Sequence, residues 1–516
     1  MAASSAFVRL ACGILVARFL LAAAWAGDHP LSAIDWLSNS VAPPQAESAP
    51  PNDVTPLAAL PSEIAVLPLD GNTPDGVGLQ PAEQLGLAPG LWGRSSAADL
   101  ARAVSTLPDG SNAPPVLNRF LRDVLTGQFD PPIDAAIDDR FFLARIDRLL
   151  SMGHLQEADE IIRRAGPEES RRFRRAFDIA LLTGNETEAC RIIENAPDIS
   201  PTYPARIFCL ARLGNWDVAA LTLGNAEALG ILAPEEEELL LHFLDPELFE
   251  GDPLPAPPRL PSPLQFRLFE AVGERIPTEQ LPVAFAVADL SSTTGWKARL
   301  RAAERLTAAG ALPVSRLLEV YAEGKPAASG GIWERVSAVG SLMTALKSED
   351  GGLVSPALAP AWKAANAGGY EKALAKWLAA RLEGRDLSDP AMRIAFEIAL
   401  LAEDPVLAEH FAGDRRESQF LLAIAKGLRG ALPGPNMLAQ AVVRGLAAHG
   451  PSPAYRVLIE GDREGEALFR ALLQLMDGAA GNPYATQQSL MLLRTLGLEP
   501  LARQVAIELV LEHGRA

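Results

Sequence analysis

Three stretches of the sequence decide the fold: LLSMGHLQEADEII (149–162), LLTGNETEACRII (181–193) and LARLGNWDVAALTL (210–223). In each, the apolar end of one helix is followed by a glycine, four residues and an alanine that belongs to the next helix. The glycine/alanine pairs are Gly153/Ala158, Gly184/Ala189 and Gly214/Ala219. Glycine readily adopts the left-handed conformation that ends a helix, and a small residue one turn later lets two helices pack closely. Because the unit recurs every 30–31 residues, we predict an all-α fold, an α-solenoid of antiparallel helical hairpins.

Looser copies of the same pattern continue toward the C-terminus. They are Gly310/Ser315, Gly368/Ala373 and Gly497/Ala502. Residues 138–230 resemble the helical hairpins of the tetratricopeptide (TPR-like) superfamily, with small residues at close contacts, glycine at turns within repeats and proline at turns between them. The period is shorter than that superfamily's, and its usual tryptophan and tyrosine positions are not matched. The resemblance implies a scaffold that binds peptides or proteins on a concave face; catalysis is uncommon in such proteins.

The composition supports a folded, helical and acidic protein. The chain has 516 residues, of which 48% are hydrophobic and 21% charged, so it can bury a large core. Aromatic residues make up only 6%, which favours helices over strands. The formal net charge of −18 repels phosphate backbones and anionic lipids, and we therefore expect no nucleic-acid partner.

Residues 1–26 are typical of a signal peptide. Basic residues without acids precede an apolar stretch and the sequence Ala24-Trp25-Ala26, a plausible cleavage site. Arg18 interrupts the apolar stretch, which argues against a permanent membrane span. We expect a periplasmic or otherwise exported protein with no stable membrane span once processed. The alternatives are a membrane anchor formed by an uncleaved N-terminal segment, and an organelle transit peptide or a misassigned start.

Two of the three cysteines, Cys190 and Cys209, flank a turn that is rich in proline. The prolines predict that one helix ends near Asn195 and the next starts near Tyr203. If these helices fold back as a hairpin, the cysteines lie at about the same height and form a disulfide in an oxidising compartment. The alternative is a pair of buried thiols that never meet.

The sequence divides into five segments. The signal peptide (1–26) precedes residues 27–94, a short apolar segment and a proline-rich flexible linker that we expect to be disordered. Trp36 in this apolar segment is either part of a docking peptide on a tether or packed back on the main body. TPR-like repeats are expected over 95–250, a proline-rich hinge over 251–263, and a C-terminal helical-repeat domain over 264–516.

A basic cluster stands out against the acidic background. It consists of Arg163, Arg164, Arg171, Arg172, Arg174 and Arg175. One interpretation is a solvated helix face whose arginines pair with nearby glutamates. The other is a docking patch for a protein partner, through an acidic peptide, or for an anionic envelope polymer.

The sequence offers little chemistry. The six histidines are isolated, and Glu238 with His242 is read as a pair on a helix surface, not as a metal site. No nucleotide-binding or nucleophile-elbow motif occurs, so we expect no cofactor, no metal and no enzyme activity.

One segment suggests an enzyme as the alternative. ESQFLLAIAKGLRGALPG (417–434) resembles a segment of soluble lytic transglycosylases, which would make Glu417 the general acid at a glycosidic bond. The later segments of that family are missing, and the polar loop expected after the phenylalanine is apolar here. The sequence therefore favours an exported scaffold for protein–protein contacts in a cell-envelope assembly, such as a motor or secretion machine. A peptidoglycan-active enzyme on the same solenoid is the second hypothesis.

Overall fold

The fold is all-α, as predicted. The computed structural model describes residues 73–108, 113–135, 138–348, 351–427, 434–479 and 481–515. Within these residues the regular structure is helical apart from two strands of two residues each. The predicted signal peptide, Trp36 and the linker up to residue 72 lie outside the described residues.

The helices follow one another with short connections. The α-helices are α3 (Ala97–Ser105), α4 (Pro115–Thr126), α5 (Arg140–Ser151), α6 (Leu155–Ala165), α7 (Ser170–Thr183), α8 (Glu186–Asn195), α9 (Tyr203–Arg212), α10 (Trp216–Ala228), α11 (Pro234–Leu244), α12 (Pro263–Ala271), α13 (Trp296–Ala308), α14 (Val314–Ala322), α15 (Gly331–Lys347), α16 (Val354–Gly368), α17 (Glu371–Leu382), α18 (Asp389–Leu401), α19 (Pro405–Phe411), α20 (Arg416–Ala425), α21 (Met437–Ala447), α22 (Pro453–Glu460), α23 (Glu464–Ala479), α24 (Pro483–Thr495) and α25 (Glu499–Arg515). The 3₁₀ helices are η1 (Pro74–Gly76), η2 (Ala82–Leu85), η3 (Pro197–Ile199), η4 (Thr278–Gln280), η5 (Val283–Leu290) and η6 (Gly351–Leu353). The strands β1 (Gln80–Pro81) and β2 (Gly127–Gln128) pair in parallel.

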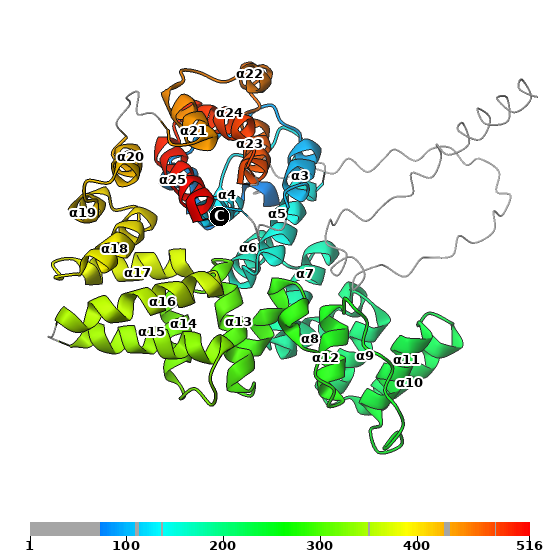
Figure 1. Cartoon of the computed structure of the whole chain (residues 1–516). Helices are drawn as coiled ribbons and strands as arrows, with labels where there is room; N and C mark the ends of the chain where they lie inside the picture. The colour runs from blue at the N-terminus through cyan, green and yellow to red at the C-terminus, as the bar shows by residue number, and fades with distance from the viewer. Residues whose placement is uncertain are drawn as a thin grey trace, which may run out of the picture.

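Consecutive helices pack against each other, as expected for a helical-repeat fold. In Figure 1 α7 to α10 follow this course, each helix in contact with the next. The turn glycines Gly153, Gly184 and Gly214 are left-handed, with φ angles of 85°, 79° and 87°. Ala158 and Ala219 are completely buried at the close contacts. The physical basis of the repeat predicted from the sequence is therefore confirmed in this segment.

The looser copies of the pattern are only partly correct. Gly310 and Gly497 are left-handed as expected, but Gly368 is the last residue of α16 and its neighbour Gly369 takes the left-handed position. The small residue predicted at 315 is exposed, so the hairpin of α13 and α14 packs without it. The sequence contains two adjacent glycines at 368–369, and spacing alone could not choose between them.

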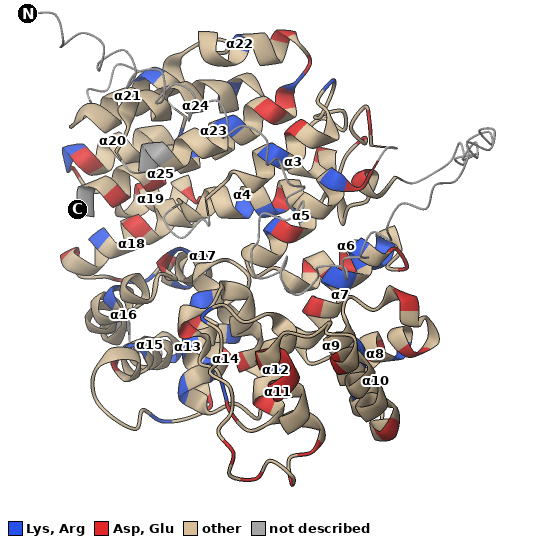
Figure 2. Ribbon diagram, turned by 90° about the vertical axis from the view of Figure 1, so that its right-hand side faces the viewer, with Lys and Arg blue, Asp and Glu red and all other residues tan. Residues whose placement is uncertain are grey.

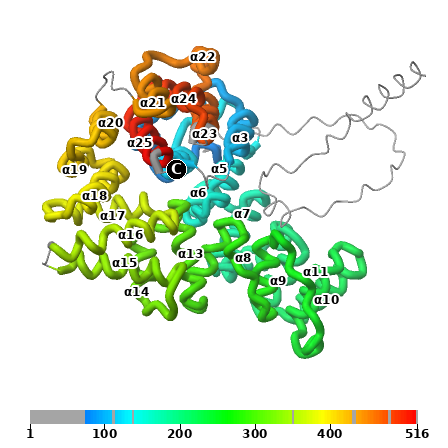
Figure 3. Tube along the Cα trace, in the orientation of Figure 1, coloured from blue at the N-terminus to red at the C-terminus, as the bar shows by residue number. Residues whose placement is uncertain are grey.

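The solenoid closes on itself. Figures 1 and 3 show the chain passing through α13 to α20 and returning, so that α23 packs on α3 and α25 packs on α4. The Gly465 amide donates to the Leu91 carbonyl oxygen at 2.9 Å, and the Arg94 amide donates to the Asp462 carbonyl oxygen at 2.6 Å. Between these bonds the Trp92 ring stacks on Phe469, with centroids 5.8 Å apart. The two ends of the described chain therefore form one joint.

Residues 73–94, part of the predicted linker, belong to the packed body. Trp92 is 1% exposed and contacts the rings of Phe129 and Phe141 at 4.9 and 5.0 Å between centroids. Arg145 of α5 holds the same segment, because its guanidinium donates to the Asp75 and Val77 carbonyl oxygens, each at 2.9 Å. A buried arginine that bonds carbonyls satisfies backbone groups that would otherwise lack partners.

The proline-rich segment predicted as a hinge, 251–263, contains no helix before Pro263. Ser262 caps α12 by accepting from the Gln265 amide at 3.1 Å, and the Gln265 side chain bonds back to the Ser262 amide. One hydrophobic core continues across this segment, from Ala82 to Val510. The helices on both sides of the segment therefore share a single core.

Candidate functional site

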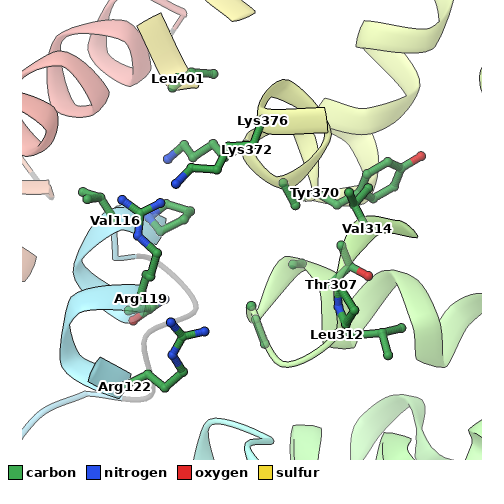
Figure 4. Close-up of a pocket in the computed structure, with 18 of the residues that line it drawn as sticks. Val116, Arg119, Arg122, Thr307, Leu312, Val314, Tyr370, Lys372, Lys376 and Leu401 are labelled. Carbon is green, nitrogen blue, oxygen red and sulfur yellow. The ribbon is translucent and has the colours of Figure 1, made fainter. Parts of the chain in front are cut away.

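The ring encloses a cavity of about 310 Å³. Its wall is built from α4, the turn before α6, the end of α13, the start of α14 and the first turns of α17, with contributions from α18 and α25. Figure 4 shows the residues that line this cavity. Because the lining comes from both ends and the middle of the chain, the cavity exists only when the ring is closed.

Four basic side chains line this cavity, which we call the central cavity. Arg119 and Arg122 lie one turn apart on α4, and Lys372 and Lys376 lie one turn apart on α17. Residues at these spacings share a helix face. In Figure 4 Arg119 from one wall and the two lysines from the other point toward the same part of the cavity. Four cations are thus gathered at one cavity of a chain whose formal net charge is −18, and one of them, Arg122, pairs with Asp123 of its own helix.

Carboxylates of the fold reach the cations from the surrounding helices. Lys376 Nζ lies 3.0 Å from Glu403 Oε1, and Arg119 bonds the same oxygen. Lys372 Nζ lies 2.7 Å from Glu512 Oε1 and 3.3 Å from Glu508 Oε2. An anion that enters the cavity would have to compete with these internal partners.

Glu508 is the deepest of these carboxylates. It accepts from the Val116 amide at 3.2 Å, in the first turn of α4, where free amides and the helix dipole favour negative charge. Burial raises the pKa of Glu508, and the charge of Lys372 only partly offsets this effect. Glu508 therefore serves as a buried structural acid that joins α25 to α4.

Glu403 is held differently, beside two of the cations that line the cavity. Its side chain is 41% exposed, beside Arg119 at 34% and Lys376 at 46%. Partial burial acts to raise the pKa of Glu403, but the charges of Arg119 and Lys376 prevail and lower it. Glu403 is thus a charged carboxylate that pairs with two of the cations that line the cavity.

The backbone of Glu403 is strained. It is left-handed, with a φ angle of 65°, at the turn between α18 and α19 where other hairpins have glycine. Such a conformation costs a non-glycine residue about 1–3 kcal/mol, whereas an exposed ion pair contributes only about 0–1 kcal/mol. The two ion pairs of Glu403 are therefore of the same order as the cost of its backbone conformation, and the net gain in folding stability is small.

A buried hydrogen-bond network fixes the start of α17. The Tyr370 and Tyr321 hydroxyls lie 2.9 Å apart, and Tyr321 donates to Glu304 Oε1 at 2.5 Å. Arg335 donates to the same carboxylate at 2.8 Å. Burial raises the pKa of both tyrosines, so they remain protonated and able to donate. The network positions the first turn of α17, and with it Lys372 and Lys376.

The geometry of the cavity suits binding of an anion. Two cations from each of two helices line the cavity, and Arg119 and Lys376 are the more exposed member of each pair. The helix N-termini of α4 and α14 also border the cavity. His154 is 3% exposed and pairs with Glu157 at 3.2 Å. Among the described residues there is no group of three or more His, Cys, Asp or Glu side chains that could hold a metal ion.

The predicted cysteine pair lies away from this cavity. The structure has α8 ending at Asn195 and α9 starting at Tyr203, as expected from the prolines. Cys190 and Cys209 form a disulfide with a Cα–Cα distance of 4.8 Å, and both residues are buried. The bond fastens the hairpin of α8 and α9, which Figure 1 shows beside the ring.

The predicted arginine cluster is split between the interior and the surface. Arg175 is 7% exposed and donates twice to the Asp147 carboxylate of α5, at 2.6 and 2.8 Å. Arg172 donates to Asp139 at 2.7 Å and to the Ala165 carbonyl oxygen at 2.7 Å. These two arginines hold α7 in place, so they do not offer free charge to a partner.

The other arginines of the cluster are nearer to solvent. Arg163 pairs with Asp159 and Glu160, and Arg164 pairs with Glu160 and donates to the Gly78 carbonyl oxygen. Figure 2 shows acidic and basic residues side by side on α6 and α7. Arg174 is half-buried, and Arg171 is exposed. The surface part of the cluster is thus a mixture of both signs of charge.

Glu417, considered as a general acid, and the pair Glu238 and His242, considered as metal ligands, lie outside the central cavity. Glu417 is exposed in the first turn of α20, outside the central cavity. His242 is 7% exposed, stacks near Phe249 and shares a hydrogen bond of 2.9 Å with the Glu238 backbone oxygen. The expectation of a pair on the helix surface is therefore wrong for His242, which is buried and bonds the Glu238 backbone and not its side chain.

The cations of the central cavity were missed in the sequence. Arg119 and Lys376 are far apart in the sequence, and each appears locally as an ordinary charge on an amphipathic helix.

Within the described part of the chain, no helix has the length and apolar character needed to cross a membrane. Comparison with protein-family models, curated proteins and solved structures found no match.

Proposed function

We propose that this protein is a TPR-like scaffold exported to the cell envelope, where it recruits a protein partner through an acidic peptide that enters the central cavity. The observation that carries the proposal is the convergence of four cations on one cavity of a strongly acidic chain. A volume of about 310 Å³ admits a chain end or a few side chains, and not a folded domain. An assembly such as a motor or secretion machine would supply such a partner.

Two features support the exported compartment. Residues 1–26 have the composition of a signal peptide. The disulfide between Cys190 and Cys209 suits an oxidising environment. Fractionation of cells, with mass analysis of the N-terminus, tests the compartment: a protein that begins at Gly27 outside the cytoplasm is expected, and Met1 on a cytosolic protein would exclude export.

Crosslinking and recovery of the partner from envelope fractions tests the site. Reversal of Arg119 and Lys376 to glutamate should abolish recovery and its dependence on salt. The matched control reverses Arg163 and Arg171, which are exposed cations on α6 and α7. If only the control pair lowered recovery, the surface cluster and not the cavity would be the docking site.

The enzyme hypothesis has its own assay on purified cell wall. We expect no release of muropeptides by the purified protein. Release that disappears in a Glu417→Gln variant would replace the scaffold proposal with a lytic transglycosylase-like activity.

A further inference from the structure

The turn between α18 and α19 carries a residue that its backbone does not favour. Among the described residues, Glu403 and Asp462 are the two non-glycine residues with positive φ angles. Aspartate tolerates the left-handed region better than most residues, whereas glutamate does not. The presence of a glutamate with a positive φ angle at position 403 therefore requires an explanation.

Glycine occupies the equivalent turn position elsewhere. At Glu403 the amide bonds to the Leu400 carbonyl oxygen and the next amide bonds to the Ala399 carbonyl oxygen. The same pair of bonds forms at Gly153 and at Gly310. Glutamate therefore stands in register with the helix-ending glycines, and the feature that distinguishes it from them is its side chain.

The Glu403 carboxylate bridges the two cations nearest to solvent. It bonds Arg119 of α4 and Lys376 of α17 through the same oxygen. The fold gains little from this contact, since all three side chains are partly exposed and the backbone is strained. The arrangement does, however, hold both cations together in a geometry that fits one carboxylate.

We propose that Glu403 is an internal competitor for the ligand, and that the ligand group that binds Arg119 and Lys376 of the central cavity is a carboxylate of an acidic peptide. This inference rests on the proposed function of the cavity. The incoming carboxylate takes Arg119 and Lys376 from Glu403, which swings into solvent. The competitor keeps the cations oriented in the free protein and restricts binding to peptides that offer several acidic groups.

The test measures binding of acetylated octaglutamate at low salt, with octaglutamine as the uncharged control peptide. Glu403→Gln keeps the side-chain length and removes the charge, and Glu403→Gly also restores the glycine of the other turns. Both variants should bind octaglutamate about 3- to 10-fold more tightly than the wild type. If Glu403→Gly folded poorly, Glu403→Gln would still decide the question.

Two further variants separate this inference from the proposed function. The double variant Arg119→Ala/Lys376→Ala should lose at least about tenfold in affinity. Glu409→Gln removes a carboxylate that pairs with Lys426 on neighbouring helices, and it should leave the affinity unchanged.

The outcomes are distinct. Tighter binding by both Glu403 variants, with no gain in Glu409→Gln, supports the role of Glu403 as a competitor. If the double variant loses binding while the Glu403 variants match the wild type, the competitor is excluded and the cavity remains the site. An equal gain in affinity for octaglutamate in Glu409→Gln would show that the effect comes from the change in net charge, and would overturn the inference. Absence of octaglutamate binding in the wild type and in both Glu403 variants would overturn the proposed function as well.

Discussion

At the scale of single residues, Asp75 is the most unusual acid in the fold. It is 1% exposed in η1, next to the Arg145 guanidinium. Burial raises the pKa of Asp75 to about 7, although the charge of Arg145 and the nearby backbone of Phe142 act in the opposite direction. Burial also lowers the pKa of Arg145, to about 10.

The raised pKa of Asp75 predicts a pH dependence of stability. The folded state holds the proton more strongly than the unfolded state, where the pKa is about 3.9. The stabilising contribution is therefore complete below about pH 4 and is lost as the pH rises through about 7. Asp75→Asn should lack this loss. Each unit of pKa shift corresponds to about 1.4 kcal/mol, so the difference between the proteins should reach a few kcal/mol.

Urea denaturation of both proteins at intervals between pH 4.5 and 8, a range that includes the rise through the folded-state pKa of about 7, measures the effect. The free energy of unfolding of the wild type should fall relative to that of Asp75→Asn as the pH rises. Parallel curves would show that Asp75 does not titrate in this range. The comparison cancels the contributions of the other carboxylates, among them Asp99 and Glu279, whose pKa values are lowered and which have the opposite dependence on pH.

A second residue-scale prediction concerns Gly93 at the ring joint. A Cβ atom at Gly93 would lie 2.2 Å from the Asp462 carbonyl oxygen, and its φ angle is 47°. Gly93→Ala should therefore destabilise the fold by about 1–3 kcal/mol. Gly224→Ala is the control, because Gly224 lies inside α10 with no atom within 4 Å of its added Cβ, and it should stabilise by about 0.5–1 kcal/mol. Equal effects in thermal unfolding would contradict the close approach at the joint.

At the scale of elements, the hairpin of α8 and α9 depends on its disulfide. Cys190 and Cys209 are 19 residues apart in the sequence, and a loop of this size stabilises a fold by about 3 kcal/mol when closed. Replacement of both cysteines by alanine should lower the free energy of unfolding by about that amount. A reducing agent should destabilise the wild type similarly and leave the variant unchanged.

Thiol labelling counts the free cysteines and so tests whether the disulfide is formed. The unfolded, unreduced protein should show no free thiol after removal of residues 1–26, and one, at Cys12, if they remain. Labelling at Cys190 and Cys209 would show that the bond does not form in the isolated protein.

The elements also show what the sequence could predict. The hairpin boundaries and the left-handed turns follow from local signals, namely proline, glycine and a small residue at a fixed spacing. The packing of residues 73–94 could not be predicted in this way. Their proline-rich sequence is typical of a linker, and the partners of Trp92 lie in α5 and α23. The cavity was equally hidden, since Arg119 and Lys376 are brought together only by closure of the ring.

At the scale of the whole molecule, the joint couples regions that lie far apart in the sequence. Trp92 fills a space between α5 and α23 and abuts Gly465. Trp92→Ala should cost about 3–5 kcal/mol of stability. Hydrogen exchange should then increase in α3 and in α23 together, because both pack at this joint.

Phe208→Ala is the control for this coupling. Phe208 is 2% exposed and stacks with Phe243, so its loss should increase exchange in α9 to α11. An unchanged α23 in the Trp92→Ala protein would mean that the joint opens without disturbing the C-terminal helices.

The closed ring changes how such a protein can evolve. An open helical array ends in two apolar faces, and each must be covered by a special terminal unit. Here α3 and α4 pack against α23 and α25, so each end of the array covers the other. Gain or loss of a single hairpin would separate these surfaces and expose both. Repeat number, which varies freely in open arrays, is therefore a fixed property of this architecture, and its variation among descendants must fall in loops and in the hairpins outside the ring.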